Sequence, residues 1–261
     1  MNNVKAASVA SAQCEPRSKD NASRRDVAIF LRDLGGGGAE RVAVLLAAGL
    51  EDLGLAVDLV LMRREGPHLA SVSPRVRIVE LGGRRALFSF VPLASYLRRV
   101  RPRAVLAVLT HANVAAVLAG KLAATDARIV LSEHSMLSRQ AAARRSWWRK
   151  PISHRLVPWL YRRADAIVAV SNGTADDLAA FGGLPREDIQ VIYNPVIDPS
   201  FEDRAREPPD HSWFAPGAPP VILAAGRLDP PKDFATLIRA FALLRRERPA
   251  RLMILGEGSQ R

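Results

Sequence analysis

The sequence predicts an α/β fold in which a parallel sheet is covered by helices on both faces. Short apolar runs of about five residues alternate with longer stretches whose apolar residues recur at helical spacing. Most of these runs are apolar without interruption, as is typical of strands buried on both faces. A proline-dense stretch at residues 194–220 then interrupts the pattern. We therefore expect one complete domain before it and a second domain that begins after it.

The first domain is expected over residues 26–193, after a leader at residues 1–25 that lacks an apolar stretch and is interpreted as disordered. Gly54 predicts the end of the first helix and Pro102 the end of the second. The apolar runs predict strands at 27–31, 55–62, 76–81, 104–109, 127–131, 166–170 and 188–193. Between them, helices are expected at 39–52, 88–100, 113–124 and 174–181.

Residues 194–220 are interpreted as a stiff linker, with Asn194 and Pro195 marking the exit from the first domain. The alternation resumes with a strand at 221–225, a helix at 234–246 and a strand at 251–255. Three elements cannot bury a core of their own. Residues 221–261 are therefore expected to be the beginning of a second Rossmann-like domain that is truncated.

The composition excludes several classes of protein. Hydrophobic residues make up 48% and charged residues 25% of the 261, which is ordinary for a globular protein and argues against disorder. The longest apolar run, Val42–Leu50, is much shorter than the roughly 18 residues of a membrane-spanning helix. Cys14 is the only cysteine, so an intrachain disulfide and a cysteine zinc site are excluded.

The net charge of +12 is unusual and regional. Residues 84–163, called the basic strip below, contain 16 Lys and Arg but only two acids, and the rest of the chain is nearly neutral. The end of the strip interleaves cations with aromatic residues, among them Trp159 and Tyr161. This mixture is typical of an anionic membrane surface, although a solvated helix pair with packed tryptophans is an alternative. The candidate surface consists of Arg144, Arg145, Trp147, Trp148, Arg149 and Lys150.

A glycine run, Gly35–Gly38, lies between the first strand and the first helix. Glycines let a backbone approach a ligand closely, and the amides of a helix N-terminus attract phosphate. The run is not a dinucleotide-binding fingerprint, because Glu40 or Arg41 stands where its third glycine belongs. A flexible turn with Glu40 favouring the helix dipole is the alternative.

A second loop, residues 226–234, also follows an expected strand and opens a helix. Arg227 offers a fork to phosphate oxygens and Lys232 a point charge, at the strand end where parallel sheets bind ligands. The alternative is two solvated cations beside a turn. The sequence thus favours Arg227 and Lys232 as a phosphate site.

Polar residues follow two central strands of the first domain. Glu133 and His134 come after the strand at 127–131, where Glu133 either contacts a ligand or orients the loop. A single histidine is more often structural than catalytic. Thr110 and His111 follow the strand at 104–109 and are interpreted as candidate caps of the next helix. The five histidines are scattered, so no metal site is expected.

Several motifs together resemble the retaining GT-B glycosyltransferases of family 4. They are Gly-Gly-Gly-Ala-Glu-Arg at 36–41, Ser-Glu-His at 132–134, Ala-Asp-Ala-Ile-Val-Ala-Val-Ser at 164–171, Ile-Tyr-Asn-Pro-Val at 192–196, Gly-Arg-Leu at 226–228, Lys-Asp-Phe at 232–234 and Leu-Ile-Arg-Ala-Phe at 237–241. The resemblance covers residues 26–261. It implies two Rossmann-like domains with a UDP- or GDP-linked sugar between them.

The resemblance also implies roles for individual residues. Arg227 and Lys232 would bind the donor phosphates, and Gly36, Gly37 and Gly38 would lie near the diphosphate or the sugar. His134 would lie beside the transferring sugar, with Glu133 as the second candidate catalytic residue. No cofactor or metal is implied.

In family members two glutamates eight positions apart, which hold the donor sugar and ribose, would come after the position of Arg261. The chain is therefore expected to be an inactive fragment of a transferase acting on a glycan or lipid-linked acceptor. It is expected in the cytoplasm, where the inner face of the plasma membrane is a candidate site of peripheral attachment, without a nucleic-acid partner. The alternative is a non-catalytic basic module that binds an anionic membrane surface or nucleic acid.

Overall fold

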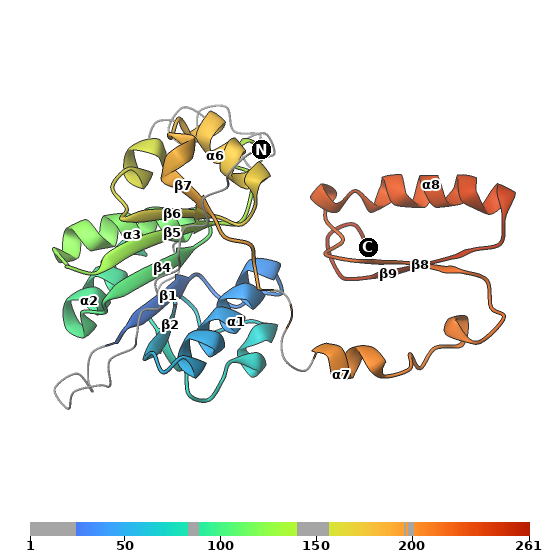
Figure 1. Cartoon of the computed structure of the whole chain (residues 1–261), viewed down its shortest axis with the longest axis horizontal. Helices are drawn as coiled ribbons and strands as arrows, with labels where there is room; N and C mark the ends of the chain where they lie inside the picture. The colour runs from blue at the N-terminus through green and yellow to red at the C-terminus, as the bar shows by residue number, and fades with distance from the viewer. Residues whose placement is uncertain (1–24, 83–88, 140–156, 196, 198–200) are drawn as a thin grey trace, which may run out of the picture. The chain divides into compact units, whose positions relative to one another are not determined.

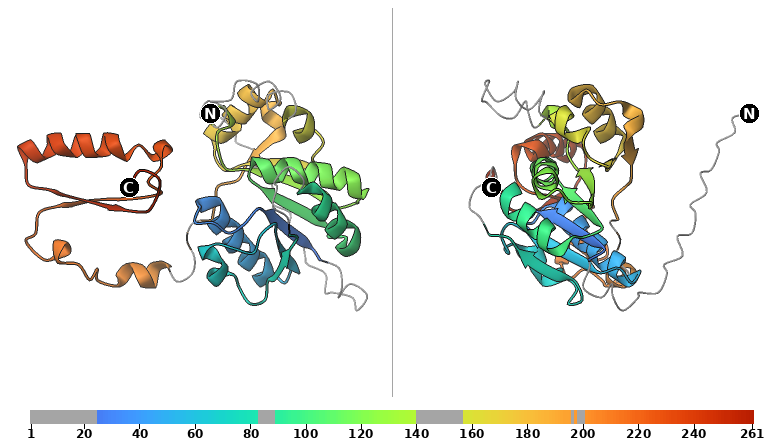
Figure 2. Two further views of the ribbon diagram at one scale, coloured as in Figure 1. Left: turned by 180° about the vertical axis from the view of Figure 1, so that it is seen from behind. Right: turned by 90° about the vertical axis from the view of Figure 1, so that its left-hand side faces the viewer.

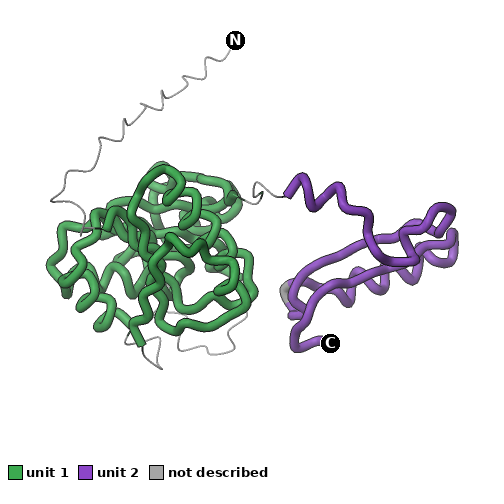
Figure 3. The backbone as a smooth tube through the Cα atoms, turned by 90° about the horizontal axis from the view of Figure 1, so that it is seen from below, with its two compact units in different colours: residues 1–198 green, residues 199–261 purple. Residues whose placement is uncertain are grey.

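The computed structural model describes residues 25–82, 89–139, 157–195, 197 and 201–261. It divides the chain into two compact units, residues 1–198 and residues 199–261 (Figure 3). The leader expected at residues 1–25 lies outside the described residues, apart from Arg25. So do the six residues of the candidate membrane surface within 144–150.

Unit 1 is built on one seven-stranded sheet with the order β3-β2-β1-β4-β5-β6-β7, in which every pair is parallel (Figure 1). This confirms the predicted Rossmann-like parallel sheet. The strand order reverses between β1 and β4, which is where such sheets bind ligands at their carboxyl ends. The strands are β1 (Val27–Leu31), β2 (Val57–Leu61), β3 (Arg77–Glu80), β4 (Ala104–Val108), β5 (Arg128–Glu133), β6 (Ala166–Ala169) and β7 (Ile189–Val191).

Two hydrophobic layers cover the two faces of this sheet. In β1, Ile29 and Leu31 pack into the layer of α1, whereas Ala28 and Phe30 pack into the layer of α2 and α3. Both faces are thus covered, which is why β1 is apolar at every position. Figure 2 shows the sheet and its helices from two further directions. The helices are α1 (Gly38–Asp52), α2 (Phe90–Val100), α3 (Thr110–Ala123) and α6 (Asn172–Gly182); residues 157–161 are also helical, and short 3-10 helices lie at Pro67–Ser71 and Arg186–Asp188.

The junction between β4 and α3 differs from the sequence prediction. α3 begins at Thr110 instead of residue 113, because Leu109 takes a φ of 79° and turns the chain straight from strand to helix. The interpretation of Thr110 or His111 as caps is wrong, since both lie in the first turn and Leu109 is the N-cap. A positive φ is rare in a leucine and leaves no sequence signal.

Unit 2 contains two parallel strands, β8 (Val221–Ala225) and β9 (Arg251–Leu255), joined by α8 (Phe234–Glu247). Both strands have the predicted bounds. Among the described residues of this unit only Ala250 is buried, and Leu223 and Leu255 remain 55% and 51% exposed. The unit therefore lacks a core of its own. Short 3-10 helices lie at Ser212–Phe214 and Pro230–Lys232.

The proline-dense stretch is more structured than its sequence predicts. It contains α7 (Phe201–Arg206), although its proline content favours a linker without a helix. The helix forms between prolines, since Pro199 precedes α7 and Pro208 follows it, so no proline falls inside the helix. The boundary between the compact units lies after Asp198, so most of residues 194–220 belong to unit 2.

Candidate functional site

Three loops that carry candidate residues lie at the carboxyl edge of the sheet in unit 1. The glycine run follows β1, Thr110 follows β4, and Glu133 is the last residue of β5. The strands β1, β4 and β5 are consecutive in the sheet, so these loops lie along the same edge, around the point where the strand order reverses. The structure thus places the glycine run and Glu133–His134, which lie far apart in the sequence, on one edge of the sheet.

The glycine run forms the start of α1. Gly37 is the N-cap and supplies no side-chain hydrogen bond, and Gly36 and Gly38 are exposed. A Cβ added to Gly38 would meet nothing within 4 Å, whereas one on Gly37 would lie 2.2 Å from Oε2 of Glu40. The carboxylate of Glu40 therefore lies over the helix start, in agreement with the alternative interpretation, and an anion would have to displace it.

Glu133 is fully buried, and its carboxylate accepts several hydrogen bonds, one of them from the backbone N–H of Ser135. The hydroxyl of Tyr161 donates at 2.8 Å and that of Thr110 at 2.9 Å. The hydroxyl of Ser135 donates at 3.1 Å and the backbone N–H of His134 at 3.2 Å. Burial raises the pKa of Glu133, and these hydrogen bonds partly oppose the rise. These contacts support the alternative in which Glu133 orients the loop.

His134 is half-buried beside this network. Its Nε2 lies 3.0 Å from Oγ of Ser132, and burial lowers the pKa of its imidazole to about 4. The ring is therefore neutral near pH 7, so it can share a hydrogen bond with a substrate but carries no positive charge.

The structure adds two residues that the sequence motifs do not place in the site. Tyr161 is fully buried, so its interpretation as an interfacial aromatic is wrong. Nδ2 of Asn113 donates to its hydroxyl at 2.9 Å and to the carbonyl of Ser132 at 3.2 Å. The sequence could have identified Asn113, because it is a polar residue within the apolar stretch 112–119. It could not have identified Tyr161, because the neighbouring arginines suggest a surface position.

Trp159, two residues before Tyr161, remains 47% exposed. The guanidinium carbon of Arg163 lies 3.5 Å from the centre of its ring, and Nζ of Lys121 lies 4.9 Å away. Both contacts are cation–π interactions. Within the described part of the basic strip, Trp159 thus keeps the combination of an exposed aromatic ring and cations that the sequence predicts.

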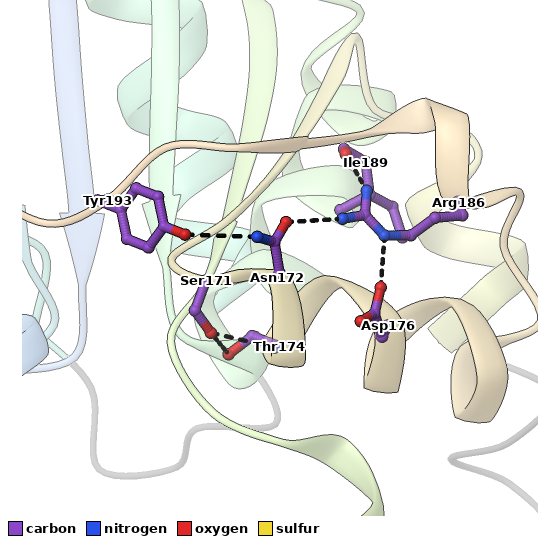
Figure 4. A network of polar contacts seen from close by, with 7 residues as sticks. All are labelled: Ser171, Asn172, Thr174, Asp176, Arg186, Ile189 and Tyr193. Atoms are coloured by element: carbon purple, nitrogen blue, oxygen red, sulfur yellow. Dashed lines mark hydrogen bonds and ion pairs between the residues drawn. The ribbon is translucent and has the colours of Figure 1, made fainter. Parts of the chain in front are cut away.

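A polar network ties the start of α6 to the end of the sheet (Figure 4). Ser171 caps the helix by accepting from the N–H of Thr174 at 3.1 Å. The side chain of Asn172 contacts both Arg186, at 3.2 Å, and the hydroxyl of Tyr193, at 3.4 Å. The chain that leaves β7 is therefore fastened to α6 before it reaches Asn194.

In unit 2 the loop after β8 is held by the chain that follows β9. The N–H of Gly226 donates to Leu255 at 2.9 Å, and that of Leu228 donates to Glu257 at 2.9 Å. The side chain of Asp229 accepts from the N–H and the hydroxyl of Ser259, at 3.3 and 3.1 Å, which lowers the pKa of this carboxyl. These contacts fix the loop that carries both predicted phosphate ligands.

Arg227 and Lys232 are both exposed on this loop. Nε of Arg227 lies 3.8 Å from Asp229, which is a weak ion pair in water. A Cβ on Gly226 would lie 3.7 Å from Cδ and Cε of Lys232, so the lysine stem passes next to Gly226, which directly precedes Arg227. The two cations therefore flank one backbone segment at the carboxyl end of β8.

Two features are absent from the described residues. No group of three or more His, Cys, Asp or Glu side chains that could hold a metal ion occurs in the described part of the chain. No helix there is both long and apolar enough to cross a membrane.

The sequence model of Glycosyltransferase Family 4 matches residues 36–200. A Campylobacter jejuni protein, N-acetylgalactosamine-N,N'-diacetylbacillosaminyl-diphospho-undecaprenol 4-alpha-N-acetylgalactosaminyltransferase, is 28% identical over 243 residues. That alignment covers 88% of this chain and 62% of the relative, so the chain spans less than two thirds of the relative's length.

Solved structures show the same fold. HepE from Anabaena, in complex with UDP and glucose, matches with a TM-score of 0.66 at 18% identity, over 90% of this chain and 62% of that protein. The apo form of the lipopolysaccharide outer core galactosyltransferase WaaB matches with a TM-score of 0.58 at 20% identity, over 89% of this chain and 61% of that protein. The architecture is that of the GT-B glycosyltransferases.

Proposed function

The chain belongs to glycosyltransferase family 4, and on that basis we propose that it is part of an enzyme that transfers a sugar, with retention, from a nucleotide donor to a glycan or lipid-linked acceptor. The donor is a UDP- or GDP-linked sugar. The UDP and glucose named for HepE support a nucleotide-sugar donor, and the C. jejuni relative's name supports a lipid-linked acceptor.

The loop with Arg227 and Lys232 is the observation that carries the proposal. A departing nucleoside diphosphate gains negative charge as the bond to the sugar breaks, and fixed cations stabilise that charge. Arg227 offers a bidentate fork, Lys232 offers a point charge, and the 256–260 segment holds their loop in place. Because the loop is fixed before a ligand arrives, little ordering would be needed on binding.

In unit 1, His134 is proposed to lie beside the transferring sugar. Its low pKa makes it a neutral hydrogen-bonding partner for a sugar hydroxyl. Glu133 is unsuited to act as a nucleophile, because it is fully buried and its carboxylate already accepts hydrogen bonds from several donors. Gly36 and Gly38, which are exposed, are proposed to lie near the donor at the start of α1, where the donor would displace the carboxylate of Glu40.

The acceptor is proposed to reach the enzyme at an anionic membrane surface, with the protein on the cytoplasmic side and peripheral. Trp159 with Lys121 and Arg163 supports this proposal, because exposed tryptophan and cations favour such surfaces. Each cation near the surface contributes on the order of 1 kcal/mol, and the contribution falls with salt. Catalysis is proposed to need no metal, so chelation with EDTA is expected to leave transfer unchanged.

Calorimetric titration of the chain with UDP, GDP and their glucose conjugates tests the donor site. We expect saturable binding that weakens about tenfold or more in Arg227→Ala. The control is Arg246→Ala, which removes an exposed arginine from α8 in the same unit and should bind like the wild type. Equal losses in both variants would show a general charge effect and overturn the assignment.

A parallel titration with duplex DNA and with phosphatidylglycerol vesicles tests the alternative of a basic binding module. Nucleotide-independent DNA binding with a steep salt dependence, without any nucleotide-sugar binding, would favour the module over the transferase. Vesicle binding that decreases in Trp159→Ala would support the membrane-side acceptor.

A further inference from the structure

We propose that Glu133 and Tyr161 are a positioning pair that fixes His134, so that the helical residues 157–161 and the loop after β5 form one rigid part of the site. The inference rests on the proposed function, in which His134 lies beside the transferring sugar. Neither residue of the pair needs to touch substrate.

The first support is the number of donors that converge on Glu133. A carboxylate has only acceptor sites, and this one accepts from Thr110, Tyr161, the His134 N–H, and both the hydroxyl and the backbone N–H of Ser135. Those donors come from α3 (Thr110), from the helical residues 157–161 (Tyr161) and from the turn itself (His134 and Ser135). A single buried carboxylate thus joins three segments.

The second support is that hydrogen bonds restrain the whole Ser132–His134 segment. The carbonyl of Ser132 accepts from Asn113 at 3.2 Å and from the N–H of Leu109 at 3.1 Å. The hydroxyl of Ser132 lies 3.0 Å from the His134 ring, and the His134 N–H donates to Glu133. The direction of the imidazole therefore depends on Asn113, Tyr161 and Glu133 together.

The third support is the cost of the arrangement. Burying a carboxylate costs several kcal/mol before hydrogen bonds offset it, and an apolar side chain would pack at the end of β5 without that cost. The network lies at the carboxyl edge of the sheet, next to the point where the strand order reverses, where parallel sheets bind ligands. A role in positioning explains why a carboxylate stands there.

The chain contains a matched control for the pair. The hydroxyl of Tyr96 donates to the fully buried Asp58 at 2.7 Å, so it repeats the chemistry of Tyr161 and Glu133. Asp58 is the second residue of β2, near the amino end of that strand, whereas Glu133 ends β5. Tyr96→Phe and Tyr161→Phe each remove one buried hydroxyl that donates to a buried carboxylate.

The test follows the imidazole of His134 by long-range ¹H–¹⁵N correlation spectra over a pH titration of the full chain, with His134→Gln for assignment. In Tyr161→Phe we expect altered His134 ring shifts and a rise of its pKa by at least half a unit from about 4, because a looser loop admits water. Tyr96→Phe should leave both unchanged. Unchanged His134 signals in a folded Tyr161→Phe protein would overturn the proposal.

Two further measurements separate this proposal from the proposed function. If Tyr161→Phe does not fold, Thr110→Val removes a different donor to Glu133 and is tested in the same way.

The spectra need no donor sugar, so a wild-type chain without transfer activity would contradict only the proposed function. Where the protein does transfer sugar, Tyr161→Phe should lower kcat several-fold with little change in the KM for donor. A fall in stability without either change would mark the pair as purely structural.

Discussion

The backbones of Gly226 and Gly256 are in direct contact in unit 2. A Cβ on Gly256 would lie 1.9 Å from the carbonyl oxygen of Gly226, and Gly256 has a φ of 158°. Because Arg227 follows Gly226 directly, this contact links the loop after β9 to the proposed phosphate site.

Gly256→Ala is therefore expected to displace the loop of Arg227. The strained backbone alone should cost about 1–3 kcal/mol, and the Kd for UDP should rise because Arg227 moves. Gly217→Ala is the control in the same unit, since Gly217 also has a positive φ but nothing lies within 4 Å of an added Cβ. Urea unfolding and calorimetry measure both effects. Similar Kd values for the two variants would contradict this role for Gly256.

Gly38→Ala separates ligand binding from folding at the start of α1. No atom lies within 4 Å of a Cβ on Gly38 or on Gly49, which is in the same helix. Alanine favours a helix over glycine by up to about 1 kcal/mol, so neither variant should destabilise unit 1. Donor affinity should fall only in Gly38→Ala, because its methyl group stands where the donor approaches the amides. Unchanged affinity in both would indicate that the glycine run is only a turn.

The lowered pKa of His134 implies that the stability of the protein depends on pH. This pKa is about 4 in the folded chain against an ordinary 6.5, so between these values the unfolded chain binds a proton that the folded chain does not. Stability should therefore fall as the pH drops from 6.5 to 4, by up to about 3 kcal/mol from this residue. The raised pKa of Glu133 acts in the opposite direction, since a folded state that takes up its proton more readily gains stability as the pH falls.

Denaturant unfolding of the wild type and of His134→Gln at several pH values isolates the histidine. The difference between the two stability curves should change between about pH 6.5 and pH 4 and stay constant above about pH 7.5. Parallel curves across this range would show that His134 is not buried as described.

We expect a substitution of Asp58 to lower the stability of the protein strongly without changing the candidate site. It is fully buried, and it contacts Arg77 at 2.9 Å, Arg25 at 3.1 Å and Tyr96 at 2.7 Å. Asp58→Asn should cost about 2–4 kcal/mol, because charged partners lose a buried acceptor. The control Asp203→Asn, in an exposed ion pair with Arg206, should cost no more than about 0.5 kcal/mol. Equal costs would contradict the burial of Asp58.

The sequence alone determined that the sheet is parallel and covered on both faces, and it determined the positions of most elements. Strands such as β1 and β8 were predicted to the residue, because a strand covered on both faces must be apolar throughout. The glycine run, His134 and the Arg227–Lys232 loop could be found for a related reason. Each lies in the loop after a strand, and in a parallel sheet these loops lie on the edge that binds ligands.

Only the tertiary structure decided which of these side chains face one another. Leu109 turns the chain with a positive φ, which places Thr110 against Glu133, and Tyr161 turns inward while Trp159 stays exposed. Neither choice follows from residue type, because a hydroxyl or an aromatic ring suits the surface and the interior alike. The energy that decides them comes from long-range contacts: Tyr161 is buried because the carboxylate of Glu133 and the amide of Asn113, 28 and 48 residues away, satisfy its hydroxyl.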